Sequence, residues 1–367
     1  RNRSRQRRGD VTRSITVATS VHPPDDPRIR VKSIATLLEV GWDVTYVCQA
    51  PGPIDTTGFE VVVLDGPRLR RTLEASRAMF SLDADVTVVH DPELLPAAIA
   101  LGRMRGRDRI VFDLHEDLPR QLMTRAASSP LMRRPSAVAS MWMLKVAERA
   151  VTVTLAEPNY SWMFADEHEV FENLPISAEL PLRREDAVGV VYVGDITQDR
   201  GVPLLVDAMG QTPGVPLTLI GRCSPSLATE LEQAAADGGV PLTMTGFLPY
   251  AEAWALAAEH CVGVSPLLDL PNYRASLPTK IDEYRAVGLI AITSDLPGSV
   301  PAIAGSDAAS SFAAGDPNAL ATELRSALHD PVRLAAAMTE APEVRRSRAW
   351  DGERFANFYE SLVTASP

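Results

Sequence analysis

The chain has too few cysteines to be held together by disulfide bonds. Only three occur among its 367 residues, far apart in the sequence, at Cys48, Cys223 and Cys261. An odd, sparse set of this kind forms neither a disulfide framework nor a zinc knuckle. Free cysteines behave as small apolar side chains. We therefore expect them in or beside strands of a protein kept in a reducing compartment.

Long apolar runs and several well-known nucleotide and hydrolase motifs are also missing. No run approaches the ~20 apolar residues of a membrane-spanning helix. The first strand is not followed by G-x-G-x-x-G, which disfavours NAD binding, and neither a Walker A motif nor a G-x-S-x-G elbow occurs. A net charge of −11 argues against general nucleic-acid binding. We expect a cytoplasmic protein without a nucleic-acid partner.

What is present is a regular alternation of strand-length apolar runs and helix-period segments. Continuous Val/Ile-rich runs indicate strands buried on both faces of a parallel sheet, and alternation with helices indicates a doubly wound α/β fold. The length favours two domains. The first series of strands is expected at 14–19, 43–48, 59–64, 85–90, 109–114 and 150–155, and the second at 188–193, 215–220, 240–246, 261–266 and 289–294.

We therefore predict two Rossmann-like doubly wound domains that face a cleft. A disordered basic leader is expected at 1–13, and a Pro-rich, charged linker at 174–187. The first domain should span 14–173 and the second 188–345. The last segment, 346–367, should be a helix that returns to the first domain.

One segment of the second half contains an unusual lysine. The stretch SLPTKIDEYRAVG predicts a helix that begins at Thr279, which puts Lys280 and Glu283 in its first turn. The N-terminal end of a helix is positive and disfavours lysine. A phosphate bound to the exposed N–H groups and to Lys280 would remove the conflict. An ordinary surface pair between the two charged side chains is the alternative.

A second basic residue is expected at the same edge of the same sheet. Strand 188–193 runs into a loop that starts at Gly194 and holds Arg200, just before the helix signalled by Pro203. Ligands of open α/β sheets bind beyond the carboxyl ends of the strands. Arg200 and Lys280 therefore both point to a phosphate site.

In the first half, three strand ends carry polar clusters that predict a polar site. Asp26 and Pro27 form a helix-capping pair. A metal hydrolase that uses His90, Asp91, Asp113, His115 and Glu116 is an alternative reading of these clusters. The residues that we expect to face an acceptor molecule are His22, Asp25, Arg28, Asp91 and Glu116.

The chain resembles the retaining glycosyltransferases of the GT-B fold, in the bacterial group that builds cell-surface glycans and glycolipids. The resemblance covers about residues 14 to 365. It is carried by YVGDITQDRG, LTLIGR, TGFLPYAEAWALAAEHCVGVSP and SLPTKIDEYRAVG in the second half, and by HPPDDPRI, HDPELL, FDLHE and ENLP in the first.

The resemblance implies a role for each matching residue. Arg200 and Lys280 would hold the donor diphosphate, Glu283 the ribose hydroxyls, and His115 would lie near the anomeric carbon. Contacts to the base are expected near Arg222 and residues 246–248. The donor site would then consist of Gly194, Arg200, Arg222, Ser276, Leu277, Pro278, Thr279, Lys280 and Glu283.

The implied reaction is transfer of a sugar, of hexosyltransferase type, from a nucleoside diphosphate sugar to a hydroxyl with retention. It needs no metal and no cofactor other than the co-substrate. The acceptor would be a glycan, a lipid-linked molecule or a small molecule. Basic residues along 103–134 followed by Met141-Trp142-Met143-Leu144 could add a peripheral contact at the inner face of the plasma membrane.

Three positions depart from the family pattern. Ala275 stands where the family has the first glutamate of its E-x7-E motif, Asp195 replaces a basic residue, and Ile290 replaces a proline. A nucleotide-sugar 2-epimerase of the same fold, or a non-catalytic nucleotide-sugar-binding protein, therefore remain alternatives.

Overall fold

The computed structural model describes residues 13–50, 56–124 and 130–364, and most of the predicted basic leader lies outside them. The chain divides into two compact units. Unit 1 consists of Arg1–Glu116, Val138–Glu172 and Asp351–Pro367, and unit 2 of Asp117–Ala137 and Asn173–Trp350. The sequence-based division placed 117–137 in the first domain, and it set 174–187 apart as a linker and 346–350 in the last helix, whereas all three segments are grouped with unit 2.

Unit 1 is built on a parallel sheet of seven strands in the order β3-β2-β1-β4-β5-β6-β7. All four residues of Val86–Val89 are buried, as expected of a central strand covered on both faces. The strands are β1 Ser14–Ala18, β2 Asp43–Gln49, β3 Glu60–Leu64, β4 Val86–Val89, β5 Ile110–Leu114, β6 Thr152–Leu155 and β7 Glu169–Val170.

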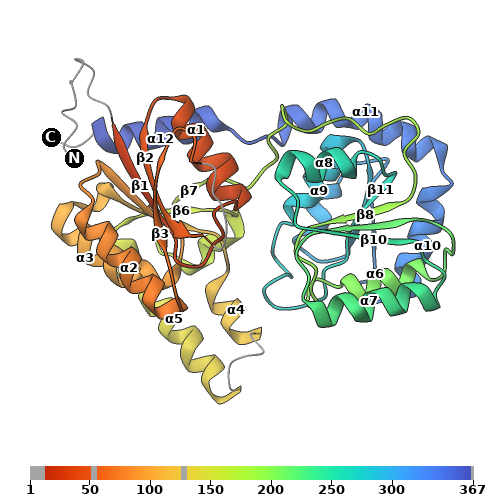
Figure 1. Ribbon diagram of the computed structural model, residues 1–367, viewed down its shortest axis with the longest axis horizontal. Helices are drawn as coiled ribbons and strands as arrows, with labels where there is room; N and C mark the ends of the chain where they lie inside the picture. Colours follow the sequence, from red (N-terminus) through yellow and green to blue (C-terminus); the bar gives the residue numbers. More distant parts are fainter. Residues whose placement is uncertain (1–12, 51–55, 125–129, 365–367) are drawn as a thin grey trace. The chain divides into compact units, whose positions relative to one another are not determined.

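Helices cover both faces of this sheet (Figure 1). Helices α2, α3 and α5 supply side chains to one core cluster, while α12 packs through Phe355 and Tyr359, with Phe355 stacked edge-on against Phe171. The bounds are η1 Pro27–Ile34, α1 Ala35–Glu39, α2 Arg68–Ser81, η2 Pro92–Leu94, α3 Leu95–Arg105, η3 Arg107–Arg109, α5 Pro130–Ala150, η4 Pro158–Met163 and α12 Gly352–Thr364. The first residues of α5 are grouped with unit 2.

Unit 2 repeats the design with six parallel strands in the order β10-β9-β8-β11-β12-β13. Strands β8 and β11 are neighbours in the centre, so the loops that follow them begin side by side. The strands are β8 Val190–Val193, β9 Leu217–Ile220, β10 Leu242–Gly246, β11 Val262–Ser265, β12 Ile290–Ser294 and β13 Ser310–Phe312.

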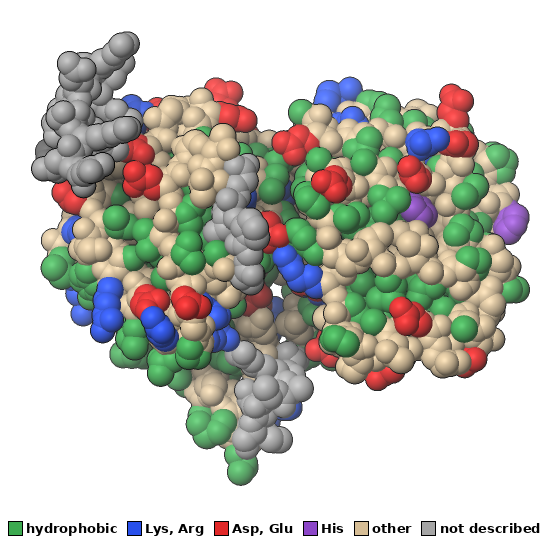
Figure 2. Space-filling view, in the orientation of Figure 1, with side chains coloured by type: hydrophobic (Ala, Val, Ile, Leu, Met, Phe, Trp, Pro, Cys, Tyr) green, Lys and Arg blue, Asp and Glu red, His purple; other side chains and the backbone are tan. Residues whose placement is uncertain are grey.

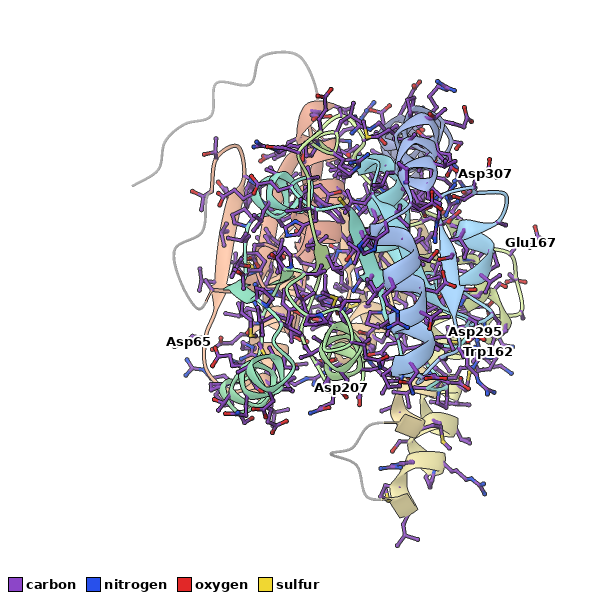
Figure 3. The ribbon with its side chains drawn as sticks, turned by 90° about the vertical axis from the view of Figure 1, so that its right-hand side faces the viewer. Asp65, Trp162, Glu167, Asp207, Asp295 and Asp307 are labelled. Atoms are coloured by element: carbon purple, nitrogen blue, oxygen red, sulfur yellow. The ribbon has the colours of Figure 1, made fainter. Side chains whose placement is uncertain are left out.

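Two apolar clusters hold the helices of unit 2 to its sheet. One joins α6, α7 and α10 to the sheet, and the other contains Trp254 of α8, Tyr284 of α9 and Val344 of α11. Acidic side chains of this unit, among them Asp207 and Asp307, point to solvent (Figure 3). The helices are α4 Leu118–Thr124, α6 Val202–Met209, α7 Pro225–Asp237, α8 Tyr250–Ala257, α9 Thr279–Val287, η5 Val300–Ile303, α10 Pro317–Leu328 and α11 Pro331–Ser347.

The expectation of two Rossmann-like domains is confirmed, and every predicted strand is present within about two residues of its expected bounds. The short strands β7 and β13 and the helix α4 were not predicted. A helix follows the predicted capping pair Asp26 and Pro27, but its first part, Pro27–Ile34, has the wider π form. Among the described residues, no helix is long and apolar enough to span a membrane.

Gly263 allows a buried tyrosine to pack against the centre of β11. A Cβ placed on Gly263 would lie 2.3 Å from the ring of Tyr284. The hydroxyl of Tyr284 accepts a hydrogen bond from the backbone N–H of Val193 at 2.9 Å. We therefore expect Gly263→Ala to lower the free energy of unfolding by about 2–4 kcal/mol through overpacking. Urea unfolding measures this loss.

The matched control is Gly305→Ala in a surface turn. Gly305 has a φ of +75°, but a Cβ there meets nothing within 4 Å, so only backbone strain of roughly 1 kcal/mol is expected. Equal losses in the two variants would contradict the packing explanation.

Candidate functional site

The helix α9 of unit 2 begins without a cap from any described side chain, and a basic side chain lies in its first turn. The helix begins at Thr279 after Pro278, as predicted. The acidic residue of its first turn, Asp282, is held by Arg348 at 3.0 Å. The positive end of the helix is therefore available to an anion.

The ammonium group of Lys280 is buried at this end without a hydrogen-bond partner. The residue is 9% exposed, and its Nζ forms no hydrogen bond with the described residues. The Nζ lies 4.0 Å from the centre of the Tyr192 ring, a cation–π contact. Such a contact recovers only part of the cost of burying a charge. The site therefore favours a negatively charged ligand.

The guanidinium of Arg200 approaches the same point as Lys280. A Cβ placed on Gly194 would lie 3.1 Å from Lys280 Nζ and 3.6 Å from Arg200 Nη1. Gly194 has a φ of +133°, and its carbonyl oxygen lies 1.9 Å from the position of a Cβ on Gly221. Gly194 and Gly221 thus let two backbone segments approach each other closely, at the point where the side chains of Lys280 and Arg200 meet.

The two positive charges oppose each other in the absence of an anion. Burial, followed by the charge of Arg200, lowers the pKa of Lys280 well below its ordinary value. For Arg200, burial also opposes the charge, but Tyr192 and Asp195 outweigh it and raise the pKa. The carboxylate of Asp195 lies 3.8 Å from the guanidinium. A bound diphosphate would favour the charged form of both side chains.

The carboxylate of Glu283 lies on the same helix and is held by a tyrosine. Glu283 is 7% exposed, and one of its oxygens accepts a hydrogen bond from the Tyr250 hydroxyl at 2.9 Å. Burial, followed by the charge of Glu283, raises the pKa of Tyr250. Sequence reasoning missed Tyr250 and Tyr192 because both reach α9 from distant segments. Their only signal was an aromatic residue inside a matching block.

The loop before α9 is fixed by a glycine from another segment. The N–H of Gly298 donates to the Arg274 carbonyl at 2.8 Å, and a Cβ on Gly298 would lie 2.3 Å from the carbonyl oxygen of Ser276. This packing holds Ser276, Leu277 and Pro278 in place. Ala275 brings no carboxylate to the loop, whereas Glu283 brings one to the helix that follows it.

A surface pocket of about 700 Å³ adjoins the loop after β8. Arg222 lines it, and the guanidinium of Arg222 stacks over the Phe247 ring at 4.0 Å. Phe247 is 39% exposed. Arg222 and Phe247, which belong to the segments expected near the base, thus contact each other at the surface, and planar side chains of this kind can stack on a nucleobase.

In unit 1, the carboxylate of Asp113 gathers the polar residues at the end of β5. Arg28 Nε and Nη2 donate to its two oxygens at 3.0 and 2.8 Å, Thr154 donates at 2.9 Å, and His115 Nε2 lies 2.7 Å away. The remaining nitrogen of the guanidinium donates to the Phe171 carbonyl. Arg28 was predicted to face an acceptor, but it is buried and engaged within the domain, so we assign it a structural role.

Asp91 was also predicted to face an acceptor, but like Arg28 it is buried and hydrogen-bonded within the domain. It is 2% exposed and accepts hydrogen bonds from Thr19 Oγ1 and from the N–H groups of Ser20 and Val21. Its carboxylate therefore fixes the loop after β1 rather than an acceptor. Asp26 caps η1 through Arg28 N and Ile29 N, which confirms the capping prediction. Glu116 is exposed, and Asp25 is partly exposed.

Three of the five residues that could serve a metal hydrolase lie close together in the structure. One nitrogen of His90, one of His115 and an oxygen of Asp113 lie within 4.8 Å of one another. Arg28 already occupies both oxygens of Asp113, and its fixed positive charge opposes a cation at this point. Asp91 and Glu116 are not part of the group. The set therefore fits a hydrogen-bonded network better than a metal site.

His115 and the neighbouring His22 differ in charge at neutral pH. Burial lowers the pKa of His115 to about 4, although Asp113 opposes the shift. Burial also disfavours the charge of His22, but Asp26 at 3.1 Å and Asp91 at 3.3 Å outweigh it and raise the pKa to about 9. A neutral imidazole and an imidazolium thus lie with ring centres 5.6 Å apart.

The matched residues of unit 2 place it in a known family. Residues 187–330 match the family model described as Glycosyl transferases group 1. This region is a group 1 glycosyltransferase domain. It contains Gly194, Arg200, Lys280 and Glu283. No curated protein sequence matches the chain.

Solved structures similar to the whole chain show that its fold is GT-B. Sucrose-phosphate synthase from Thermosynechococcus elongatus is 18% identical, with a TM-score of 0.75, and the match covers 96% of this chain and 100% of that one. HepE from Anabaena in complex with UDP and glucose is 14% identical, with a TM-score of 0.72 and coverage of 96% and 100%. WaaG, a glycosyltransferase of lipopolysaccharide biosynthesis, is 14% identical, with a TM-score of 0.69 and coverage of 94% and 99%.

The raised pKa of His22 predicts a pH-dependent contribution to stability. The value is 6.5 for an ordinary histidine and about 9 here, so the contribution is complete below pH 6.5 and is lost as pH rises through about 9. We expect His22→Gln to cost up to about 3 kcal/mol at acidic to neutral pH and little at high pH. Urea unfolding at a series of pH values measures the difference.

The exposed His329 at the end of α10 supplies the control for this experiment. His329→Gln should cost little at any pH. A His22→Gln deficit that grows as pH rises would overturn the charge assignment.

Proposed function

We propose that the protein is a retaining glycosyltransferase that moves a hexose from a nucleoside diphosphate sugar to a hydroxyl acceptor. The single observation that carries the proposal is the buried Lys280 ammonium without a hydrogen-bond partner, beside Arg200 and the uncapped start of α9. A diphosphate supplies the missing partner with the charge and size that this arrangement suits. Glu283 is on the same helix and can accept from sugar hydroxyls.

The chemistry of the proposed reaction explains why two cations are useful at this point. As the bond between the sugar and the diphosphate breaks, negative charge develops on the leaving oxygen. Arg200, Lys280 and the N–H groups of α9 would stabilise that charge in place of a divalent metal. In the proposal the donor binds unit 2, and unit 1 binds the acceptor through His22, His115, Asp25 and Glu116.

The comparisons favour a uridine nucleotide as the first donor to test. HepE is described with UDP and glucose bound, and WaaG acts in lipopolysaccharide synthesis. We therefore propose a UDP-sugar donor and a role in cell-surface polysaccharide or glycolipid synthesis. The reaction would take place in the cytoplasm, with a peripheral contact at the inner face of the plasma membrane.

Ala275 favours two other candidate functions that need the nucleotide sugar but not its transfer. The missing carboxylate removes one acceptor of hydrogen bonds from the loop below the proposed sugar position. A protein that binds the nucleotide sugar without transferring it, or a 2-epimerase of the same fold, would also use the diphosphate site. Incubation of UDP-sugar without acceptor identifies the epimerase, because only the epimerase yields an epimer. Incubation with an acceptor then separates the transferase, which forms a glycosylated product, from the binding protein, which does not.

Lys280→Ala and Arg200→Ala are each expected to lower kcat for sugar transfer by about 100-fold or more, the typical effect of removing a donor to a developing negative charge. Steady-state transfer from UDP-sugar measures the loss.

The control is Arg325→Ala, an exposed arginine on α10 of the same unit. It should retain the wild-type rate. Near-wild-type turnover in both site variants would remove the basis of the proposal, provided that each variant unfolds at the wild-type temperature.

UDP binding is expected to take up a proton. The pKa of Lys280 is lowered in the free protein, and a bound diphosphate raises it. Between these two pKa values the complex carries more protons than the free protein. The affinity should therefore fall as pH rises through that interval, by at most about tenfold per pH unit for one linked proton.

Calorimetry in buffers of different ionisation enthalpy measures the uptake, at pH values where the diphosphate itself is fully ionised. Lys280→Ala should bind UDP more weakly and without the linked proton. Zero uptake by the wild-type protein at every pH tested would contradict the assignment.

A further inference from the structure

One face of α5 is exposed and apolar along most of its length. Leu131, Val138 and Trp142 are 86%, 70% and 70% exposed. Spacings of seven and four residues bring these side chains onto one face of a helix. The opposite face is the one that packs, through Ser140, Leu144 and Ala147. A large exposed tryptophan on such a face has no role in the core of the protein.

The basic residues of α5 lie on the same exposed face. Arg134, Lys145 and Arg149 are exposed and fall within the same helical stripe as Trp142. The helix has a single acidic residue, Glu148, which is buried and accepts hydrogen bonds from the N–H groups of Ala165 and Asp166. The exposed face of α5 is therefore purely cationic and apolar, although the whole chain has a net charge of −11.

A second exposed tryptophan lies just before a segment that is hydrogen-bonded to α5. Glu148 anchors the segment that follows η4, and Trp162 of η4 is 45% exposed (Figure 3). Apolar side chains cover the tip at which α5 begins (Figure 2). Aromatic and basic residues on one helical face are the pattern of helices that lie in a membrane interface.

We propose that the face of α5 formed by Leu131, Arg134, Val138, Trp142, Lys145 and Arg149 docks on an anionic lipid bilayer. The apolar and aromatic side chains enter the headgroup region, and the arginines and lysine contact the acidic headgroups. The helix lies in the plane of the interface and does not span the membrane.

Charge decides between a bilayer and a second copy of this chain. A symmetric dimer across this face would bring Arg134 of one copy near Lys145 or Arg149 of the other. The face carries no carboxylate to compensate these charges. An anionic bilayer complements every one of them, and each basic residue near such a surface strengthens binding about five-fold.

Co-sedimentation of the full chain with vesicles tests the proposal, using phosphatidylcholine alone or mixed with phosphatidylglycerol. The wild-type chain should bind the mixed vesicles at least tenfold better. Trp142→Ser with Val138→Ser should lose binding by about tenfold or more. Lys145→Glu with Arg149→Glu should remove the preference for phosphatidylglycerol. Tryptophan fluorescence should shift to the blue on binding in the wild-type chain.

Matched controls come from unit 2. Val332 on α11 is 75% exposed, and Arg325 on α10 is exposed, so Val332→Ser and Arg325→Glu should bind vesicles like the wild type. Vesicle binding needs no sugar transfer, so its failure is distinguishable from failure of the proposed reaction. The proposal is overturned by absent binding, by equal binding to both vesicle types, or by binding that the α5 variants leave unchanged. It is also overturned by a dimer in light scattering that Trp142→Ser dissociates, because the face would then be a contact between copies.

Discussion

The buried amino group of Lys280 is the constraint on which the proposed site of unit 2 depends. A lysine ammonium in a buried position costs free energy unless an anion or a strong acceptor compensates it. Here the compensation within the described chain is limited to the face of the Tyr192 ring and the more distant carboxylates. The glycine turns at 194 and 221 bring backbone and Arg200 to the same point. These features have one explanation in common, a ligand with two or more negative charges.

Unit 1 shows the opposite treatment of buried charge. Arg28 and Asp113 neutralise each other inside the domain, and Asp113 also contacts His115. The pair fixes the end of β5, and burial keeps His115 neutral at physiological pH although Asp113 favours its charged form. One sheet edge therefore holds its charges in a closed network, whereas the other keeps positive charge available. The contrast agrees with a division in which unit 2 binds the charged donor and unit 1 an uncharged hydroxyl.

The sequence was sufficient for the features that depend on local patterns. Apolar runs predicted the strands, and the start of α9 followed from Pro278 and Thr279. The strands β7 and β13 have only two and three residues, too short for any periodic signal. Contacts across distant segments were also out of reach. Arg28 was expected to face an acceptor, because nothing near it reveals a partner 85 residues away. The tyrosines that contact Lys280 and Glu283 were missed for the same reason.

A crystal structure of the protein grown with UDP tests most directly whether Lys280 and Arg200 hold a diphosphate. We expect the diphosphate at the N-terminal end of α9, with its oxygens within hydrogen-bond distance of Lys280 Nζ and the Arg200 guanidinium, and the ribose hydroxyls beside Glu283. A nucleotide bound elsewhere, or a diphosphate at this end that neither Lys280 nor Arg200 contacts, would show that the two side chains do not form the donor site.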